Sequence, residues 1–240
     1  MIKEELKPII EAIIKDAFKR IEYAYQHQRE SIIDIPETVN EERETRTRLI
    51  FPRYAKSRKD GKEVETRISE QELRFAFVEA FNAYCETKHI EDLYYSIETP
   101  TKNRYSGFTS NPQRNDNNGR SGEFDLVIFK KEKDVLKRSC LIEFKAKNAG
   151  QIDHWKDIIK LKEEGTDILC YFIEILKSFS DATINSLVDK KFEGFFKKEE
   201  YEKYLNNGIV VNVRCYALEG KMIGQKTEGF GERIDLADLI

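Results

Sequence analysis

Residues 122–129 read Gly-Glu-Phe-Asp-Leu-Val-Ile-Phe and, after a charged turn, residues 141–147 read Leu-Ile-Glu-Phe-Lys-Ala-Lys. Both runs are apolar enough to form buried strands, yet each of them carries acidic side chains. A buried acid is costly unless it is paired with a cation or holds a metal ion. These two segments therefore predict neighbouring strands whose acidic side chains pair with a cation or hold a metal ion.

Asp125, Glu143 and Lys145 are the candidate catalytic residues of these strands. On adjacent strands, Asp125 and Glu143 can lie side by side at one end of a sheet. Side chains alternate along a strand, so Glu143 and Lys145 share a face, and Phe144 packs in the core with its backbone carbonyl available as a metal ligand. Ligation by oxygen alone favours Mg²⁺ or Mn²⁺. The set is typical of metal-assisted phosphodiester hydrolysis.

The roles of the individual side chains leave alternatives open. Lys145 could orient or deprotonate the attacking water, or stabilise the charge of the transition state. It could instead only form an ion pair with Glu143 or Asp125. Glu123 shares a face with Asp125 but lies nearer the preceding loop, so it is a supporting residue, a ligand of a second ion, or an exposed acid.

Asp125 together with Glu143-Phe144-Lys145, after an acidic helix and before a crossover helix, resembles the PD-(D/E)xK phosphodiesterase superfamily over about residues 69–176. The resemblance implies a restriction-endonuclease-like fold, dependence on a divalent metal, and cleavage of DNA or, in some members, RNA. The family's Pro-Asp is Phe124-Asp125 here, which leaves the ligand itself unchanged.

Many members carry a further Glu on the first core helix, and Glu72 is the best match in this chain, with Glu70 and Glu79 as alternatives. Glu72 could equally complete a capping box with Ser69, in which each side chain satisfies a backbone N–H of the first helical turn.

The rest of the chain predicts an α/β fold with a central mixed sheet flanked by helices and preceded by an N-terminal helical extension. Apolar residues at helical spacing mark 3–30, 69–88 and 151–164. Strands are expected at 93–99, 123–130, 138–146, 167–176 and 208–218. The strand–helix–strand step from 138 to 176 predicts a parallel pair, and the shorter connections before it predict antiparallel neighbours. The expected domains are 1–68, a helix and basic linker, and 69–240, the nuclease-like domain.

The composition of the chain limits how it can bind a partner. The 240 residues carry a net charge of −3, so contact with nucleic acid has to come from a local patch. The polar segment 100–122 is expected to be a substrate-facing loop or, alternatively, a plain mobile hairpin tip. Arg104, Arg114 and Arg120 within it, with Lys147 after the second strand, are the candidate nucleic-acid-binding residues. Lys160 on the crossover helix could reach the edge of the site.

The location is expected to be cytoplasmic. The four cysteines lack zinc-like spacing and are typical of buried thiols in a reducing compartment. The chain shows no signal-peptide pattern and no run long enough to span a bilayer, so no membrane partner is expected.

Three functions compete at this point. The leading one is a metal-dependent nuclease acting most naturally on DNA, in defence against foreign DNA or in repair, with a homodimer or a partner protein as possible assemblies. The second is a catalytically inactive nuclease-like fold that binds nucleic acid or protein. The third is an interaction protein built around the 3–30 helix. The residues do not distinguish DNA from RNA, single from double strands, or endo- from exonuclease activity.

Overall fold

A computed structural model of the chain describes residues 2–27, 47–51, 53–55, 64–107, 112–146, 150–179, 199–204, 207–220 and 233–235, and the structural statements below concern these residues. They divide into two compact units, 8–89 on the one hand and 1–7 with 90–240 on the other. Each unit is described by itself.

The 8–89 unit holds most of helix α1 (Ile2–His27), the hairpin β1 (Arg53–Ala55) and β2 (Val64–Thr66), and helix α2 (Glu70–Lys88). Arg20 of α1 lies 3.5 Å from Glu79 of α2 and pairs also with Asp16 at 2.9 Å. The capping box at the start of α2 is present, with Ser69 N–H donating to Glu72 Oε2 at 2.9 Å. The helix ends at His89, whose left-handed conformation (φ 52°) stops the helical repeat.

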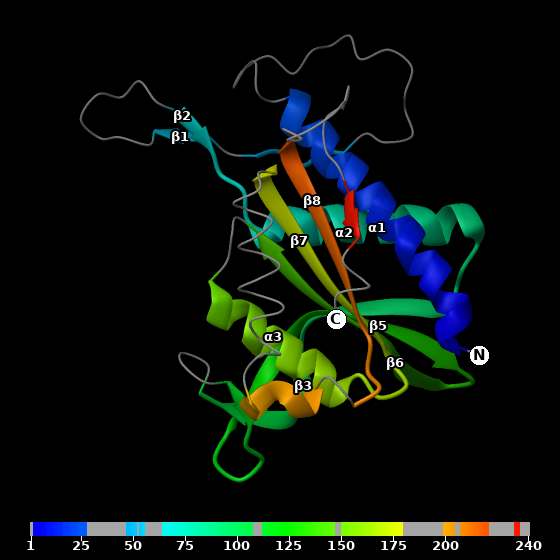
Figure 1. Ribbon diagram of the computed structural model, residues 1–240. Coiled ribbons are helices and arrows are strands. Elements are labelled where there is room, and N and C mark those ends of the chain that lie inside the picture. The colour runs from blue at the N-terminus through cyan, green and yellow to red at the C-terminus, as the bar shows by residue number, and fades with distance from the viewer. Residues whose placement is uncertain are drawn as a thin grey trace. The chain divides into compact units, whose positions relative to one another are not determined.

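The other unit is built on a seven-stranded sheet with the order β4-β3-β5-β6-β7-β8-β9 (Figure 1). Its first four strands are antiparallel, β6, β7 and β8 run parallel, and β9 pairs antiparallel with β8. The strand bounds are Leu93–Ser106 (β3), Gln113–Arg114 (β4), Arg120–Glu132 (β5), Val135–Ala146 (β6), Leu169–Phe179 (β7), Val211–Gly220 (β8) and Arg233–Asp235 (β9).

Helix α3 (Gln151–Glu164) makes the predicted crossover between β6 and β7 and packs on one face of the sheet (Figure 1). Gly165 follows it directly. A Cβ at Gly165 would lie 2.4 Å from Cys170 Sγ and 2.6 Å from the Leu161 carbonyl oxygen. Only glycine allows the chain to turn from α3 into β7 at so short a distance.

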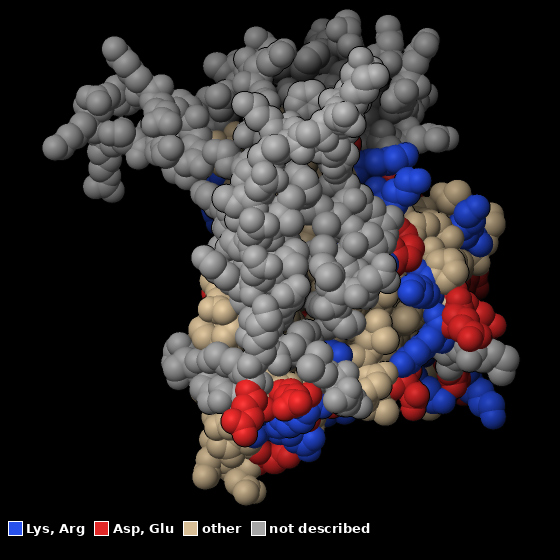
Figure 2. Space-filling model, viewed as in Figure 1, with Lys and Arg blue, Asp and Glu red and all other residues tan. Residues whose placement is uncertain are grey.

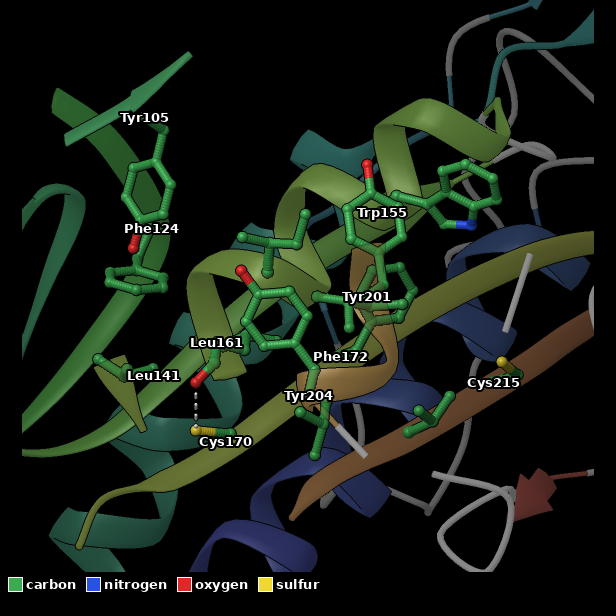
Figure 3. Packing of buried hydrophobic residues seen from close by; sticks show 14 of the residues in the cluster. Tyr105, Phe124, Leu141, Trp155, Leu161, Cys170, Phe172, Tyr201, Tyr204 and Cys215 are labelled. Atoms are coloured by element: carbon green, nitrogen blue, oxygen red, sulfur yellow. Dashed lines mark hydrogen bonds between the residues drawn. The ribbon is translucent and has the colours of Figure 1, made fainter. Parts of the chain in front are cut away.

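The core of this unit lies between α3, the sheet and the 3-10 helix η3 (Glu199–Tyr204). Figure 3 shows aromatic side chains from these elements gathered there, among them Trp155, Phe172, Tyr201 and Tyr204. The Trp155 and Tyr201 rings meet edge to face with centroids 5.7 Å apart. Cys170, also in this cluster, directs its Sγ toward the Leu161 carbonyl oxygen at 3.6 Å.

The segment expected to be a loop, 100–122, is largely strand. β3 continues to Ser106, β5 begins at Arg120, and β4 pairs with the end of β3. The turn before β5 is closed by Gly119 N–H donating to the Asn115 carbonyl at 2.7 Å, at a place where a Cβ on residue 119 would lie 2.4 Å from that oxygen. The polar composition of 100–122 suggested a loop, but an exposed hairpin extension also needs few apolar residues. Residues 108–111 lie outside the described part.

The mixed α/β class, the central mixed sheet, the antiparallel early strands and the parallel β6–β7 pair are confirmed. The more specific restriction-endonuclease-like core stays a prediction. The predicted domain boundary at 68/69 also stays a prediction, and the compact units group α2 with α1 rather than with the sheet. No helix of the described residues is both long and apolar enough to cross a membrane.

Candidate functional site at the end of β5 and β6

The β5–β6 hairpin brings Asp125 and Glu143 together. Its antiparallel register pairs Leu126 with Ile142, so Asp125 and Glu143 are the next positions along the two strands. Beyond that pair, the Phe144 N–H donates to Asp125 Oδ2 at 2.7 Å. The Asp125 side chain therefore takes over a backbone donor of the neighbouring strand, which fixes its carboxylate beside residues 143–145. Asp125 is partly exposed.

Glu143 lies on the face of β6 that α3 covers, where its residue is 1% exposed. Its Oε1 lies 2.5 Å from the ammonium of Lys160 on α3. The same ammonium lies 2.8 Å from Asp157 Oδ1 and donates to the Glu123 carbonyl oxygen at 2.7 Å. The buried acid on β6 is thus met by a buried lysine from the crossover helix.

Lys145 points to the same face as Glu143, as strand alternation predicts. Its ammonium lies 2.7 Å from Asp157 Oδ2 and donates to the Phe144 carbonyl oxygen at 2.8 Å. Asp157 therefore bridges two lysines, one from the strand and one from its own helix. We refer to Asp125, Glu143, Lys145, Asp157 and Lys160 as the strand-end cluster.

The charges within the strand-end cluster set its protonation. Burial, together with the negative charges of Asp157 and Asp125, raises the pKa of Glu143 well above its usual range, and Lys160 and Lys145 offset this only in part. For Asp157, burial alone would raise the pKa, but Lys160 and Lys145 lower it below the usual range. The cluster therefore contains one acid held ionised by two lysines and one acid that favours its proton.

The predicted metal ligands can be tested against this geometry. Among the described residues, no three His, Cys, Asp or Glu side chains gather as a group that could hold a metal ion. The three predicted ligands, Asp125, Glu143 and the Phe144 carbonyl, lie at neighbouring positions of β5 and β6. Within the same described part, the buried Glu143 Oε1 accepts no hydrogen bond, and its close partner is the Lys160 ammonium. Oxygen ligands of this kind suit a hard divalent cation, and in this structure Lys160 contacts Glu143 and Lys145 contacts the Phe144 carbonyl.

Glu72 belongs to the other unit, where its carboxylate accepts hydrogen bonds from Ser69, the structural alternative recognised in the sequence. Its catalytic role stays a prediction, as do those of Glu70 and Glu79. Lys147 lies outside the described residues.

The three predicted DNA-contacting arginines lie on the hairpin extension. Arg114 pairs with Asp116 at 2.7 Å and with Glu163 at 3.3 Å. Arg104 and Arg120 are exposed. Figure 2 shows basic and acidic atoms side by side around η3, in keeping with the contacts of Glu163 to both Arg114 and Lys203. Binding of nucleic acid by these three arginines stays a prediction.

Asp157 is the member of the cluster to which the sequence assigned no role, and Lys160 was placed only at the edge of the site. The sequence did contain a signal that Asp157 is buried. Asp157 lies three residues after His154 and four before Leu161, which places a charge within the buried stripe of an amphipathic helix. His154 is also fully buried, with Nε2 2.9 Å from Glu174 Oε2.

Comparisons of the chain with protein-family models, with curated proteins and with solved structures find no match. The resemblance to PD-(D/E)xK enzymes therefore rests on the residues of this chain alone.

Proposed function

We propose that this protein is a divalent-metal-dependent phosphodiesterase that hydrolyses nucleic acid, with DNA as the first substrate to test. The observation that supports it best is the meeting of Asp125, Glu143 and Lys145 at one end of β5 and β6, where their charged groups are held by hydrogen bonds and ion pairs. A chain that needed only a stable sheet would gain nothing from burying this set.

In this proposal Asp125, Glu143 and the Phe144 carbonyl hold one Mg²⁺ or Mn²⁺ ion. When bound, such an ion supplies a water of lowered pKa and neutralises charge on the phosphate. Lys145 has its ammonium fixed by Asp157, so it is available to stabilise the negative charge that develops on the phosphate. Asp157 itself acts as a positioning residue, because its partners are the two lysines.

A second candidate function is a nuclease-like fold that binds nucleic acid or protein without cutting. One observation favours it. The two lysines already contact oxygen atoms that would have to bind the metal, Lys160 at the Glu143 carboxylate and Lys145 at the Phe144 carbonyl. A metal would have to displace or rearrange these contacts.

A cleavage assay separates the two functions. The substrates are linear and circular double-stranded DNA, single-stranded DNA and RNA, each with Mg²⁺, Mn²⁺ or EDTA. The variants are Asp125→Asn, Glu143→Gln and Lys145→Met. The same hairpin supplies matched controls away from the site, namely Asp134→Asn, Glu132→Gln and Lys131→Met.

Metal-dependent cleavage that is lost in the three site variants and kept in the three controls supports the nuclease. Binding of Mn²⁺ that needs Asp125, without cleavage of any substrate, supports the binding module. If neither cleavage nor Mn²⁺ binding is detected, the nuclease proposal is wrong.

A further inference from the structure

Three oxygen atoms surround the Lys160 ammonium. They are Glu143 Oε1 at 2.5 Å, the Glu123 carbonyl at 2.7 Å and Asp157 Oδ1 at 2.8 Å. They come from β6, β5 and α3, so the three elements converge on a single positive charge. The ammonium donates a hydrogen bond to the Glu123 carbonyl and forms ion pairs with the two carboxylates.

The aliphatic part of the Lys160 side chain is also buried and packed. The residue is 5% exposed, and its Nζ lies 5.6 Å from the centre of the Phe124 ring. A Cβ at residue 122 would lie 3.1 Å from Lys160 Cδ, so Gly122 leaves room for the stem. A buried path and a fixed end point distinguish Lys160 from a surface lysine that folds back on a nearby acid.

Two carboxylate oxygens and one backbone carbonyl are also the ligand types that a divalent cation takes in proteins. Nucleases that use two metal ions hold them close together with shared carboxylates. Here Glu143 is the carboxylate that would be shared, because it faces Lys160 and stands beside Asp125 in the register of the hairpin.

We propose that the Lys160 ammonium stands in the place of a second divalent cation, so that the strand-end cluster takes one divalent ion per chain. This inference rests on the proposed function for the first ion, held by Asp125, Glu143 and Phe144. Unlike a bound metal ion, the Lys160 ammonium is covalently attached to the chain and cannot dissociate from these three oxygen atoms.

Titration calorimetry with Mn²⁺ on the full chain tests this inference. The proteins are wild type, Lys160→Ala and the control Lys156→Ala, a half-buried lysine on the same helix that pairs with Asp153. Lys160→Met is the second variant, because its side chain keeps the stem but ends before the ammonium position. Circular dichroism confirms that each protein is folded before it is titrated. If Lys160→Ala does not fold, the same comparison is made with Lys160→Met.

We expect one Mn²⁺ per chain in wild type and in Lys156→Ala, and two in Lys160→Ala. Two ions in wild type, or one ion both in wild type and in a folded Lys160→Ala protein, would overturn the inference and leave the proposed function standing. No ion in wild type and one in Lys160→Ala would support the cation cage while removing the metal from the proposed function. No binding in any protein would overturn both.

Discussion

Asp157 Oδ2 lies 2.7 Å from the ammonium of Lys145, so a carboxylate of the crossover helix fixes the lysine of the Glu-x-Lys motif. Its other oxygen, Oδ1, lies 2.8 Å from Lys160. The side chain is 1% exposed, so both contacts are shielded from solvent. This one residue connects the strand that carries the motif to the helix that covers it.

Asp157→Asn should be strongly destabilising. The substitution leaves two buried ammonium groups with one acid fewer, and breaking a buried ion pair from one side costs about 3 kcal/mol or more. Urea unfolding followed by circular dichroism measures the loss. Asp153→Asn on the same helix, where the side chain is 52% exposed, is the control and should change stability by well under half as much. Equal losses in the two variants would show that the bridge contributes no special stability.

Glu143 should make stability depend on pH in the direction opposite to an ordinary carboxylate. Its pKa is raised, first by burial and then by Asp157. The folded chain therefore holds this proton more tightly, and the stabilisation is fully present below the usual glutamate pKa and is lost as the pH rises through the folded value.

Glu143→Gln keeps the neutral form at every pH. In EDTA, we expect its melting temperature to equal that of wild type near pH 4 and to exceed it near pH 9. Thermal melts across this range test the expectation, with Glu132→Gln at the far end of the hairpin as the control. A Glu143→Gln protein that melts below wild type at pH 9 would mean that the attraction of the ionised Glu143 to Lys160 outweighs the cost of burying its charge.

Glu164 should hold the bulged part of β3 in place. Its oxygens accept hydrogen bonds from the backbone N–H groups of Lys102 and Asn103, each at 2.9 Å, and from the Tyr105 hydroxyl at 3.2 Å. Glu164→Gln turns one acceptor into a donor that faces another donor. We expect a loss of about 2 kcal/mol, the value of a hydrogen bond to a charged group.

Hydrogen exchange provides a local measurement for the same variant. The amides of Lys102 and Asn103 should exchange faster in Glu164→Gln, whereas amides in the β7–β8 pair should change only with global stability. Glu202→Gln on the exposed side of η3 is the control. Unchanged exchange at residues 102 and 103 would contradict the role given to Glu164.

The cysteines should label unequally. All four are free thiols, and Cys140, Cys170 and Cys215 are buried whereas Cys85 is partly exposed. For Cys170, burial raises the pKa of the thiol to about 12, and Lys3 and Lys162 offset this only in part. Since the thiolate is the reactive form, Cys170 should be inert in the folded chain.

An aromatic disulfide reagent at pH 8 should modify one thiol per folded chain quickly and all four in denaturant. The fast phase should disappear in Cys85→Ala. Fast labelling of more than one thiol in wild type would show that the core opens more readily than the packing around Leu161 and Cys170 indicates.

Much of the sheet was predictable from local pattern. The helix over 151–164 and the strands on either side of it have clear periodicities, and the structure places them as expected. The strands within 100–122 were not predicted, since an exposed hairpin extension is rich in turn-forming polar residues and resembles a loop. The expected strand at 167–176 was correct in kind but extends to Phe179.

The sequence by itself determined that Asp125 and Glu143 would meet, because a short turn forces antiparallel pairing and alternation then sets which residues share a face. It also determined that Glu143 and Lys145 point the same way. Only the tertiary structure decided what lies opposite them. The rotation of α3 about its axis depends on how Trp155, Ile158 and Leu161 pack against distant strands, and that packing brings Asp157 and Lys160 to the acids of the hairpin. Contacts between a helix and a sheet are set by such long-range packing, which no local pattern encodes.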